Sequence, residues 1–272
     1  MQPGDQARHS FLETMWDHYA RHGREALPWR QPEPDGSFDP YKIMVSELML
    51  QQTQVPRVIP KYAVFLEQFP TTQALAKAEL GDVLRVWQGL GYNRRAKFLW
   101  QAAQMVDSLK YFPDTPEELV KLPGVGRNTA GAILAYAHNR PVVFVETNVR
   151  TVYIHHFFHD HTDVADKDIL SLVEQTLDYE NPREFYWALM DYGSHLKASV
   201  GNLNKVSRHY TKQSTFHGSR RQIRGQVIRL LGSGDASLAD LQAGIADERL
   251  ADVLKDLVSE GLIRAEGDRY SL

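Results

Sequence analysis

The chain has 272 residues, with a hydrophobic fraction of 43%, a charged fraction of 24% and a net charge of −3. These values suit a globular protein of one large or two smaller domains, and they do not by themselves indicate a nucleic-acid binder. The absence of cysteine excludes disulfides, cysteine zinc sites and cysteine-bound iron–sulfur clusters.

Helical periodicity predominates up to about residue 215, and proline or glycine marks most of the joints between helices. No alternating strand pattern is sustained in this part, so we predict an all-α body. The expected helices, in chain order, cover residues 40–54, 57–68, 72–78, 80–87, 93–109, 115–120, 127–138, 147–158, 167–178 and 183–196.

The C-terminal part follows a polar, basic connector over residues 197–219. Apolar residues at helical spacing predict three short helices, and Glu266-Gly267-Asp268 between two short apolar-containing segments predicts a hairpin. The helices are expected at 220–231, 237–244 and 247–260, and the hairpin strands at 262–265 and 269–272. We therefore expect a small winged-helix-like domain over residues 216–272, a fold that binds DNA in some proteins and other proteins elsewhere.

Charge is unevenly distributed along the chain. No acidic residue occurs from Tyr192 to Gly234, and a second basic cluster lies at 92–97. Acidic residues gather instead between Asp160 and Glu184. A basic face can grip a polyanion despite a negative total charge, although a charged cluster can also be an ordinary solvated surface. The acid-free stretch contains Lys197, Lys205, Arg208, Lys212, Arg220, Arg221, Arg224 and Arg229.

A two-glycine hairpin, Leu122-Pro123-Gly124-Val125-Gly126, precedes the helix expected at 127–138. Glycines let backbone N–H groups point outward where the helix dipole is positive, which favours binding of a phosphate. The plain alternative is a helix–turn–helix corner. Glu146, a lone acid, opens the next helical segment and suggests chemistry on a nucleic acid strand.

Four ordered motifs resemble those of the helix-hairpin-helix (HhH-GPD) DNA glycosylases, and most closely the MutY-type A/G-specific adenine glycosylases. The resemblance covers about residues 25–195. The motifs are ELMLQQTQV at 47–55, VWQGLGYNRRA at 86–96, LPGVGRNTAGAI at 122–133 and FYWALMDYG at 185–193.

The resemblance implies a two-lobed helical body with a flipped base held between the lobes. One lobe would cover about 37–142, and the other would join residues 1–36 to 143–215. We expect a monomer of the cytoplasm, nucleoid-associated if bacterial, whose partner is duplex DNA with a damaged or mismatched base. No membrane contact is expected, because the sequence lacks an apolar signal core and any run of about 18 apolar residues.

Cleavage of an N-glycosidic bond requires protonation of the leaving base and stabilisation of positive charge on the sugar, and two carboxylates can divide these roles. Apolar neighbours favour a raised pKa for Glu47, which suits a general acid. The resemblance assigns the sugar-facing role to Glu146, with Asn148 holding the water or the carboxylate. The family has aspartate at this position, and the extra methylene moves the carboxylate by ~1.5 Å. The alternative for Glu146 is an acid at a helix N-terminus without a catalytic role.

The resemblance also implies the residues that contact DNA and the base. Gln51, Gln52 and Tyr92 would enter the base stack, and Trp29 and Arg30 would line the base pocket. Further DNA contacts are expected from Arg94, Arg95, Gly124, Val125, Gly126, Arg127, Asn128, Thr129, Arg220 and Arg221.

Asn128 departs from the glycosylase-lyases of the family, which carry lysine there. Because a Schiff base requires an amine, we expect no lyase activity. Relatives usually carry four cluster-binding cysteines after the motif at 185–193, and this chain has none. Neither a cofactor nor a side-chain metal site is expected, although K⁺ or Na⁺ is plausible at hairpin carbonyls near Leu122 and Val125.

The C-terminal part does not resemble the domain that recognises 8-oxoguanine opposite adenine. We predict a monofunctional glycosylase of base excision repair, acting on adenine mismatched with 8-oxoguanine or guanine. The alternatives are another base (uracil, thymine opposite guanine, hypoxanthine or an alkylated purine) and an inactive protein that binds DNA lesions.

Overall fold

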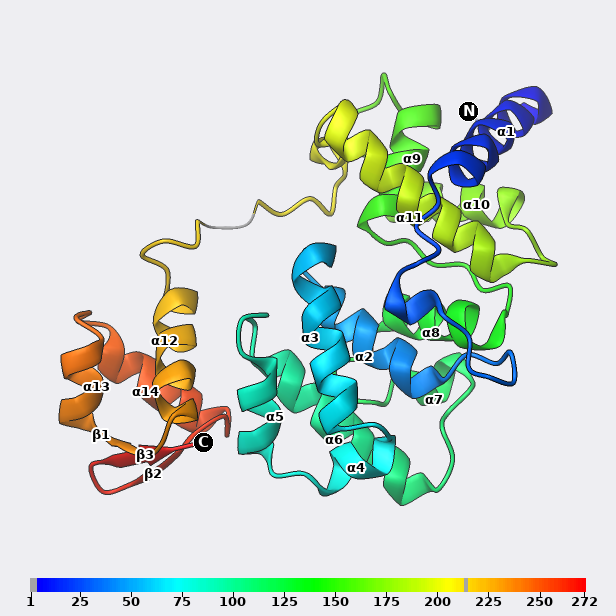
Figure 1. Ribbon diagram of the computed structural model, residues 1–272. Coiled ribbons are helices and arrows are strands. Elements are labelled where there is room, and N and C mark those ends of the chain that lie inside the picture. Colours follow the sequence, from blue (N-terminus) through cyan, green and yellow to red (C-terminus); the bar gives the residue numbers. More distant parts are fainter. Residues whose placement is uncertain (1–3, 213–214) are drawn as a thin grey trace. The chain divides into compact units, whose positions relative to one another are not determined.

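The computed structural model describes residues 4–212 and 215–272, and most of these residues are helical (Figure 1). The chain divides into two compact units that interleave along the sequence. The first consists of Met1–Ile43, Asp114–Val120 and Val125–Lys212. The second consists of Met44–Pro113, Lys121–Gly124 and Gln213–Leu272. The predicted all-α body is confirmed.

The first unit is built around one long helix, α11 (Pro182–Ser199), which packs against α1, α8 and α9. In Figure 1 α11 runs alongside α9. Phe11 of α1 and Tyr153 of α9 are buried with ring centroids 5.3 Å apart. The other elements of this unit are α1 (Asp5–His22), η1 (Pro28–Arg30), α7 (Pro116–Leu119), α8 (Arg127–His138), α9 (Thr147–Phe157), α10 (Asp166–Thr176) and η2 (Leu203–Val206).

The helix α2 (Pro40–Leu50) begins in the first unit and continues into the second. There α6 packs against α4 and α5, and Trp87 and Phe65 are buried edge to face with centroids 6.0 Å apart. The helices of this part are α3 (Val55–Gln68), α4 (Thr72–Lys77), α5 (Leu80–Trp87) and α6 (Arg94–Leu109).

The C-terminal part of the second unit combines three helices with a small antiparallel sheet of order β1-β3-β2. Tyr270 of β3 is paired with Ala236 on one side and Ala265 on the other. Its elements are α12 (Arg220–Gly232), β1 (Ala236–Ser237), α13 (Leu238–Gly244), α14 (Leu250–Ser259), β2 (Arg264–Glu266) and β3 (Arg269–Ser271). The expected three helices and hairpin are present, and the two-residue strand β1 was not predicted because it is too short to alternate.

The sequence locates most helix ends within a few residues, because capping residues mark them. Thr71, Thr115 and Ser219 each accept a backbone N–H at the start of α4, α7 and α12. The largest difference is at α2, which ends at Leu50 instead of residue 54, and a turn follows in which Gln52 has a φ of 58°.

The two units differ from the expected lobes in two respects. Residues 114–120 and 125–142 group with the first unit, since α7 packs against α8 and α8 packs against α11. The C-terminal residues group with residues 44–113 instead of standing apart, since α12 packs against α5. Among the described residues, no helix has the length and apolar content needed to cross a membrane.

Candidate functional site

Glu146 is the N-cap residue of α9, with extended backbone angles of φ −103° and ψ 175°. Its main-chain carbonyl accepts the hydrogen bond of Arg150 N at 2.8 Å, which starts the helix. Its side chain makes no capping hydrogen bond. The carboxylate of this residue, which is half-buried as a whole, therefore does not cap α9, and this weakens the alternative that it serves only as a helix-terminal acid.

The Glu146 carboxyl titrates near neutral pH. Burial raises its pKa to about 7, while the positive charge of Arg150 acts in the opposite direction. Arg150 also forms two 2.8 Å hydrogen bonds with the carboxylate of Asp166. Because that ion pair offsets the charge of Arg150, burial dominates. A carboxyl with such a pKa can both hold and release a proton at physiological pH.

The backbone around Glu146 is held from two sides. Asn128, the second residue of α8, donates a 2.7 Å hydrogen bond from Nδ2 to the carbonyl of Val145. On the other side, Gly193 of α11 lies so close to Asn148 that an added Cβ would be 2.5 Å from the Asn148 carbonyl oxygen. The Asn148 amide itself lies 3.7 Å from the Met190 sulfur, a weak acceptor. These contacts fix the position of Glu146 within the first unit.

Glu47 lies in the C-terminal half of α2, in the part that belongs to the second unit. Its helix neighbours Val45, Leu48 and Met49 are buried, while Glu47 itself is half-buried. The apolar surroundings expected of a general acid are thus present along the helix, and the raised pKa of Glu47 stays a prediction.

Arg95 links the end of α2 to the loop before α6. The residue is buried, at 7% exposure, and among residues 4–212 and 215–272 its guanidinium has no carboxylate partner; burial lowers its pKa to about 10. Nη1 donates to the carbonyls of Leu48, Met49 and Gln51 at 2.6–2.9 Å. Nη2 donates to the carbonyls of Leu90 and Gly91 and to the hydroxyl of Thr53, each at 3.1 Å.

This placement corrects the expectation that Arg95 contacts DNA. Its guanidinium is directed to oxygens inside the protein, so its role is to hold together the two loops that carry Gln51, Gln52 and Tyr92. Its neighbour Arg94 is exposed, and the DNA contact expected of it stays a prediction.

Both of these loops contain a non-glycine residue with left-handed backbone angles. The φ angles of Gln52 and Tyr92 are 58° and 48°. Such angles are uncommon outside turns and persist only where the surroundings fix them. Gln52 is exposed, and Gln51 and Tyr92 are half-buried. The loops therefore present these side chains from a constrained backbone.

The hairpin glycines have different structural roles. Gly124 has a φ of 79°, and a Cβ there would lie 2.8 Å from the Cβ of Phe98. Gly126 is the N-cap of α8 with extended angles, and nothing lies within 4 Å of an added Cβ. Arg127 and Asn128 are exposed beside it, whereas Val125 and the expected DNA contact Thr129 are buried.

Trp29 and Arg30 are buried in the first unit. Arg30 donates from both terminal nitrogens to the carboxylate of Asp191 at 2.8 Å, and Arg24 binds the same carboxylate at 2.7 Å. Burial tends to raise the pKa of Asp191, but the hydrogen bonds and charges of Arg30 and Arg24 outweigh it and lower the pKa. The guanidinium of Arg30 therefore holds a buried carboxylate, and the expected place of Trp29 and Arg30 in the base pocket stays a prediction.

The sequence did not reveal Asp191 as a partner of Arg30, since 161 positions separate them. A lone acid inside the apolar motif at 185–193 was the available signal, because a buried carboxylate requires a cation.

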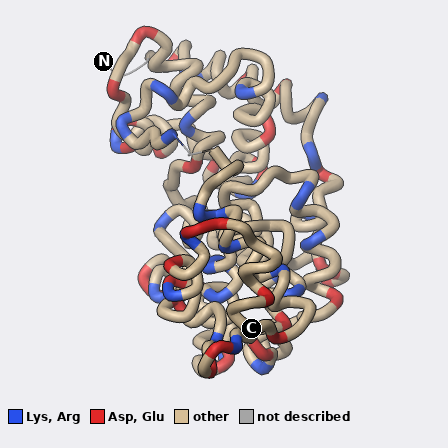
Figure 2. Tube along the Cα trace, turned by 90° about the vertical axis from the view of Figure 1, so that its left-hand side faces the viewer, with Lys and Arg blue, Asp and Glu red and all other residues tan. Residues whose placement is uncertain are grey.

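The acid-free stretch runs through both units, and some of its arginines pair with acids of the unit in which they lie. Arg208 pairs with Asp163, and Arg220 pairs with Asp256 at 2.6 Å. Figure 2 shows Lys and Arg interspersed with Asp and Glu around the C-terminus. The expected separation into one basic and one acidic face is therefore incomplete.

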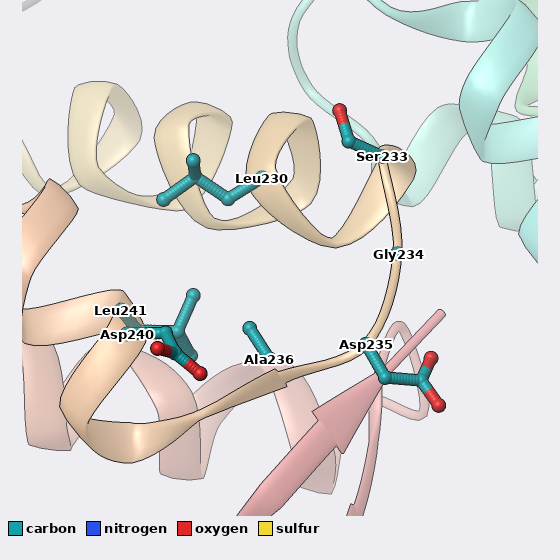
Figure 3. Close-up of a pocket in the computed structure, with 7 residues that line it drawn as sticks. All are labelled: Leu230, Ser233, Gly234, Asp235, Ala236, Asp240 and Leu241. Carbon is teal, nitrogen blue, oxygen red and sulfur yellow. The ribbon is translucent and has the colours of Figure 1, made fainter.

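A surface pocket in the C-terminal part is lined by the end of α12, by β1 and by α13 (Figure 3). It holds two acids, and Asp240 accepts hydrogen bonds from the main chain and hydroxyl of Ser237 in a capping box. Its lining includes none of the predicted site residues: Leu230, Ser233, Gly234, Asp235, Ala236, Asp240 and Leu241.

The connector after α11 is held by hydrogen bonds to other parts of the first unit. No cysteine exists in the chain to bind a cluster. Asn204 donates a 2.7 Å hydrogen bond to the Thr151 hydroxyl, and Val164 exchanges backbone hydrogen bonds with Val206 and Arg208. Across residues 4–212 and 215–272, no group of three or more His, Asp or Glu side chains is arranged to hold a metal ion.

Residues 45–175 match the model of the HhH-GPD superfamily of base excision DNA repair proteins. The adenine DNA glycosylase of Mycobacterium tuberculosis (strain H37Rv) is 31% identical, with 97% of this chain and 94% of the relative covered. That of Buchnera aphidicola subsp. Baizongia pistaciae is 32% identical over 80% of this chain, which spans only 63% of that relative. Among solved structures, a trapped endonuclease III–DNA covalent intermediate matches with a TM-score of 0.59 and 18% identity, covering 71% of this chain and 88% of that one.

Proposed function

This chain belongs to the HhH-GPD superfamily of base excision DNA repair proteins, among its adenine DNA glycosylases, and on that premise we propose that it hydrolyses the N-glycosidic bond of adenine in duplex DNA. The observation that carries the proposal is the carboxylate of Glu146, which makes no capping hydrogen bond and has a pKa of about 7. The hydrogen bond from Asn128 to the carbonyl of Val145 holds the backbone next to it. Such a group is held in place and can ionise near neutral pH, as the charge-stabilising carboxylate of a glycosidase needs to do.

In this mechanism Glu47 and Glu146 act on the same extruded nucleotide. Glu47 gives its proton to the leaving adenine as the bond between the sugar C1′ and the base nitrogen breaks. The ionised Glu146 stabilises the positive charge that grows on the sugar. A water molecule then adds to C1′ and releases a proton to Glu146, so that the products are adenine and an abasic site.

The nucleotide must leave the helix before this chemistry, at a cost of a few kcal/mol. Gln51, Gln52 and Tyr92 are proposed to fill the gap, and the N–H groups that follow Gly124 to bind the flanking phosphate. We propose that hairpin carbonyls near Leu122 and Val125 hold K⁺ or Na⁺. Replacement of these ions by tetramethylammonium at constant ionic strength should then weaken duplex binding.

We propose that the protein acts as a monomer without lyase activity. The Asn128 amide cannot form a Schiff base, and it is engaged with the carbonyl of Val145. Borohydride should therefore fail to cross-link the protein to DNA during turnover, and the product strand should break only after alkali treatment.

The substrate is proposed to be adenine opposite 8-oxoguanine or guanine. The test is a panel of duplexes with adenine, uracil, thymine, hypoxanthine or an alkylated purine at one position, opposite each partner base. Wild type should release adenine, and Glu47→Gln and Glu146→Gln should each lower the single-turnover rate by ~10²-fold or more. Tight binding with no base released from any duplex would identify the inactive lesion-binding protein instead.

A further inference from the structure

Tyr92 is held by a residue from the C-terminal part of the chain. Its hydroxyl is hydrogen-bonded to Nη1 of Arg221, which lies 129 positions further along, in the first turn of α12. The guanidinium carbons of Arg221 and Arg95 lie 5.2 Å and 5.5 Å from the centre of the Tyr92 ring. Both distances are typical of cation–π contacts. The ring and the hydroxyl of Tyr92 are thus both engaged.

A second contact fastens α14 to the start of α6, close to Tyr92 in the sequence. Glu260, the C-cap of α14, accepts hydrogen bonds from Arg224 of α12 at 3.1 and 2.5 Å. The same carboxylate lies 3.8 Å from Nε of Arg94, and the main-chain carbonyl of Glu260 accepts a hydrogen bond from Lys97. One residue therefore ties the C-terminal helices to α6.

The interface continues along α5. Arg85 donates a 3.3 Å hydrogen bond from Nε to the carbonyl of Gly232, at the end of α12. At the start of α5, Gly81 lies so close to Leu272 that an added Cβ would be 3.2 Å from the Leu272 Cβ. Contacts along the whole of α12 and at the chain end therefore hold Arg221 at its place beside Tyr92.

Arg221 also suits this contact chemically. The planar guanidinium stacks on an aromatic ring and donates to an oxygen at the same time, which a lysine ammonium cannot do. A side chain that is to enter a base stack loses rotational freedom on doing so. If it is already held in one orientation, less of that freedom is lost when the base is extruded.

We propose that Arg221 is a positioning residue that holds Tyr92 ready to enter the duplex, and that the C-terminal helices act in base extrusion through it. This inference rests on the proposed function, because it assigns Tyr92 a part in extruding the target nucleotide. Arg221 acts through Tyr92 and is not a catalytic residue.

The test compares wild type with Arg221→Ala and Arg221→Lys. A duplex with 2-aminopurine beside the target adenine reports extrusion as a rise in fluorescence in stopped flow, and single-turnover release of adenine follows on the same sample. We expect Arg221→Ala to slow both extrusion and release by ~10-fold, with Arg221→Lys restoring less than half of the loss, since misplacement of a contributing group has effects of this size. Unchanged or faster extrusion would overturn the proposal, and faster extrusion would show that Arg221 restrains Tyr92 from entering the stack.

Two further variants separate positioning from a general loss of positive charge. Arg264→Ala removes one charge from an exposed position of β2 in the same part of the chain. It should leave extrusion within about twofold of wild type. In a Tyr92→Ala background, Arg221→Ala should have no additional effect beyond about twofold, because the group that it positions is already missing. An undiminished effect in that background, or an equal effect of Arg264→Ala, would contradict the proposal.

Hydrogen–deuterium exchange of the DNA-free protein keeps this inference distinct from the proposed function. Arg221→Ala should speed exchange in peptides that cover residues 88–98, whether or not the protein releases a base. If wild type released no base but this exchange rose, the proposed function would fail while the contact held. If exchange at 88–98 did not change, the positioning role would be refuted even in an active glycosylase.

Discussion

The side-chain amide of Asn128 donates a 2.7 Å hydrogen bond to the carbonyl of Val145, the residue that directly precedes Glu146. The helix of the two-glycine hairpin is thereby joined to the backbone that carries the carboxylate. At the position where lyases of the family carry lysine, this chain has a residue whose observed contact is structural. Glu146 and the Asn128 amide, which holds the residue before Glu146, therefore form one local arrangement.

Loss of this brace should slow the reaction more than it weakens DNA binding. Asn128→Ala removes the donor, and Asn128→Asp keeps the shape but places a carboxylate against a carbonyl oxygen. Both should lower the single-turnover rate of adenine release by ~10-fold or more, because Glu146 would no longer be held at one position. Duplex affinity, measured by fluorescence anisotropy, should stay within about threefold. Wild-type rates in both variants would show that the brace is not used.

The rate should depend on pH through Glu146. The ionised carboxylate is the active form, and burial raises its pKa to about 7, so kcat/KM should rise with pH through a midpoint near 7. An unburied glutamate would place that midpoint near 4.5. Glu146→Gln should be slow and should lack this rise, whereas Glu184→Gln, at an exposed position of α11, should retain it. A profile of Glu146→Gln that still rises through pH 7 would assign the titration to another group.

The same pKa predicts a cost in stability. Because the folded-state pKa lies above the ordinary value of 4.5, the stabilisation from protonated Glu146 is complete below pH 4.5 and is lost as the pH rises through about 7. Glutamine has no such loss. Glu146→Gln should therefore be more stable than wild type at pH 8, by about 1–3 kcal/mol, with little difference at pH 4.5. Urea denaturation at the two pH values measures this, and equal stability at pH 8 would show that the carboxylate is not penalised by burial.

The hairpin glycines offer a matched pair of variants. Gly124→Ala must adopt a φ of 79° and place a Cβ 2.8 Å from Phe98, so it should cost about 2 kcal/mol or more in unfolding free energy. Gly126→Ala meets open space at ordinary angles and should change stability by less than about 1 kcal/mol. Thermal or urea unfolding distinguishes the two, and a similar cost for both would contradict the assigned roles.

The helices were predictable because each depends on local periodicity and on capping residues near it in the sequence. The roles of the arginines were harder to predict from the sequence. In YNRRAK, Arg94 and Arg95 look alike as DNA contacts, yet Arg95 lies on the same helix face as the buried Leu99 and Ala102. Helical spacing alone could have indicated its burial, but its six oxygen acceptors come from two separate stretches of the chain, residues 48–53 and 90–91.

Other features depend on tertiary structure, and local patterns do not identify which residues are partners. The partnership of Arg30 with Asp191 and the contact of Arg221 with Tyr92 each join residues more than a hundred positions apart. The strand β1 has two residues and exists only through its pairing with β3. The raised pKa of Glu146 arises from its burial in the folded chain. Periodicity predicts elements, whereas the environment of a titratable group depends on how distant segments pack.

The most direct test of the central claim is single-turnover release of adenine from a duplex with adenine opposite 8-oxoguanine, measured for wild type and Glu146→Gln at pH 8. Our account predicts free adenine and an alkali-labile abasic strand from wild type, and a rate lower by ~10²-fold or more from Glu146→Gln. Equal rates for the two proteins would contradict the account, because the carboxylate at the start of α9 would then have no part in breaking the bond.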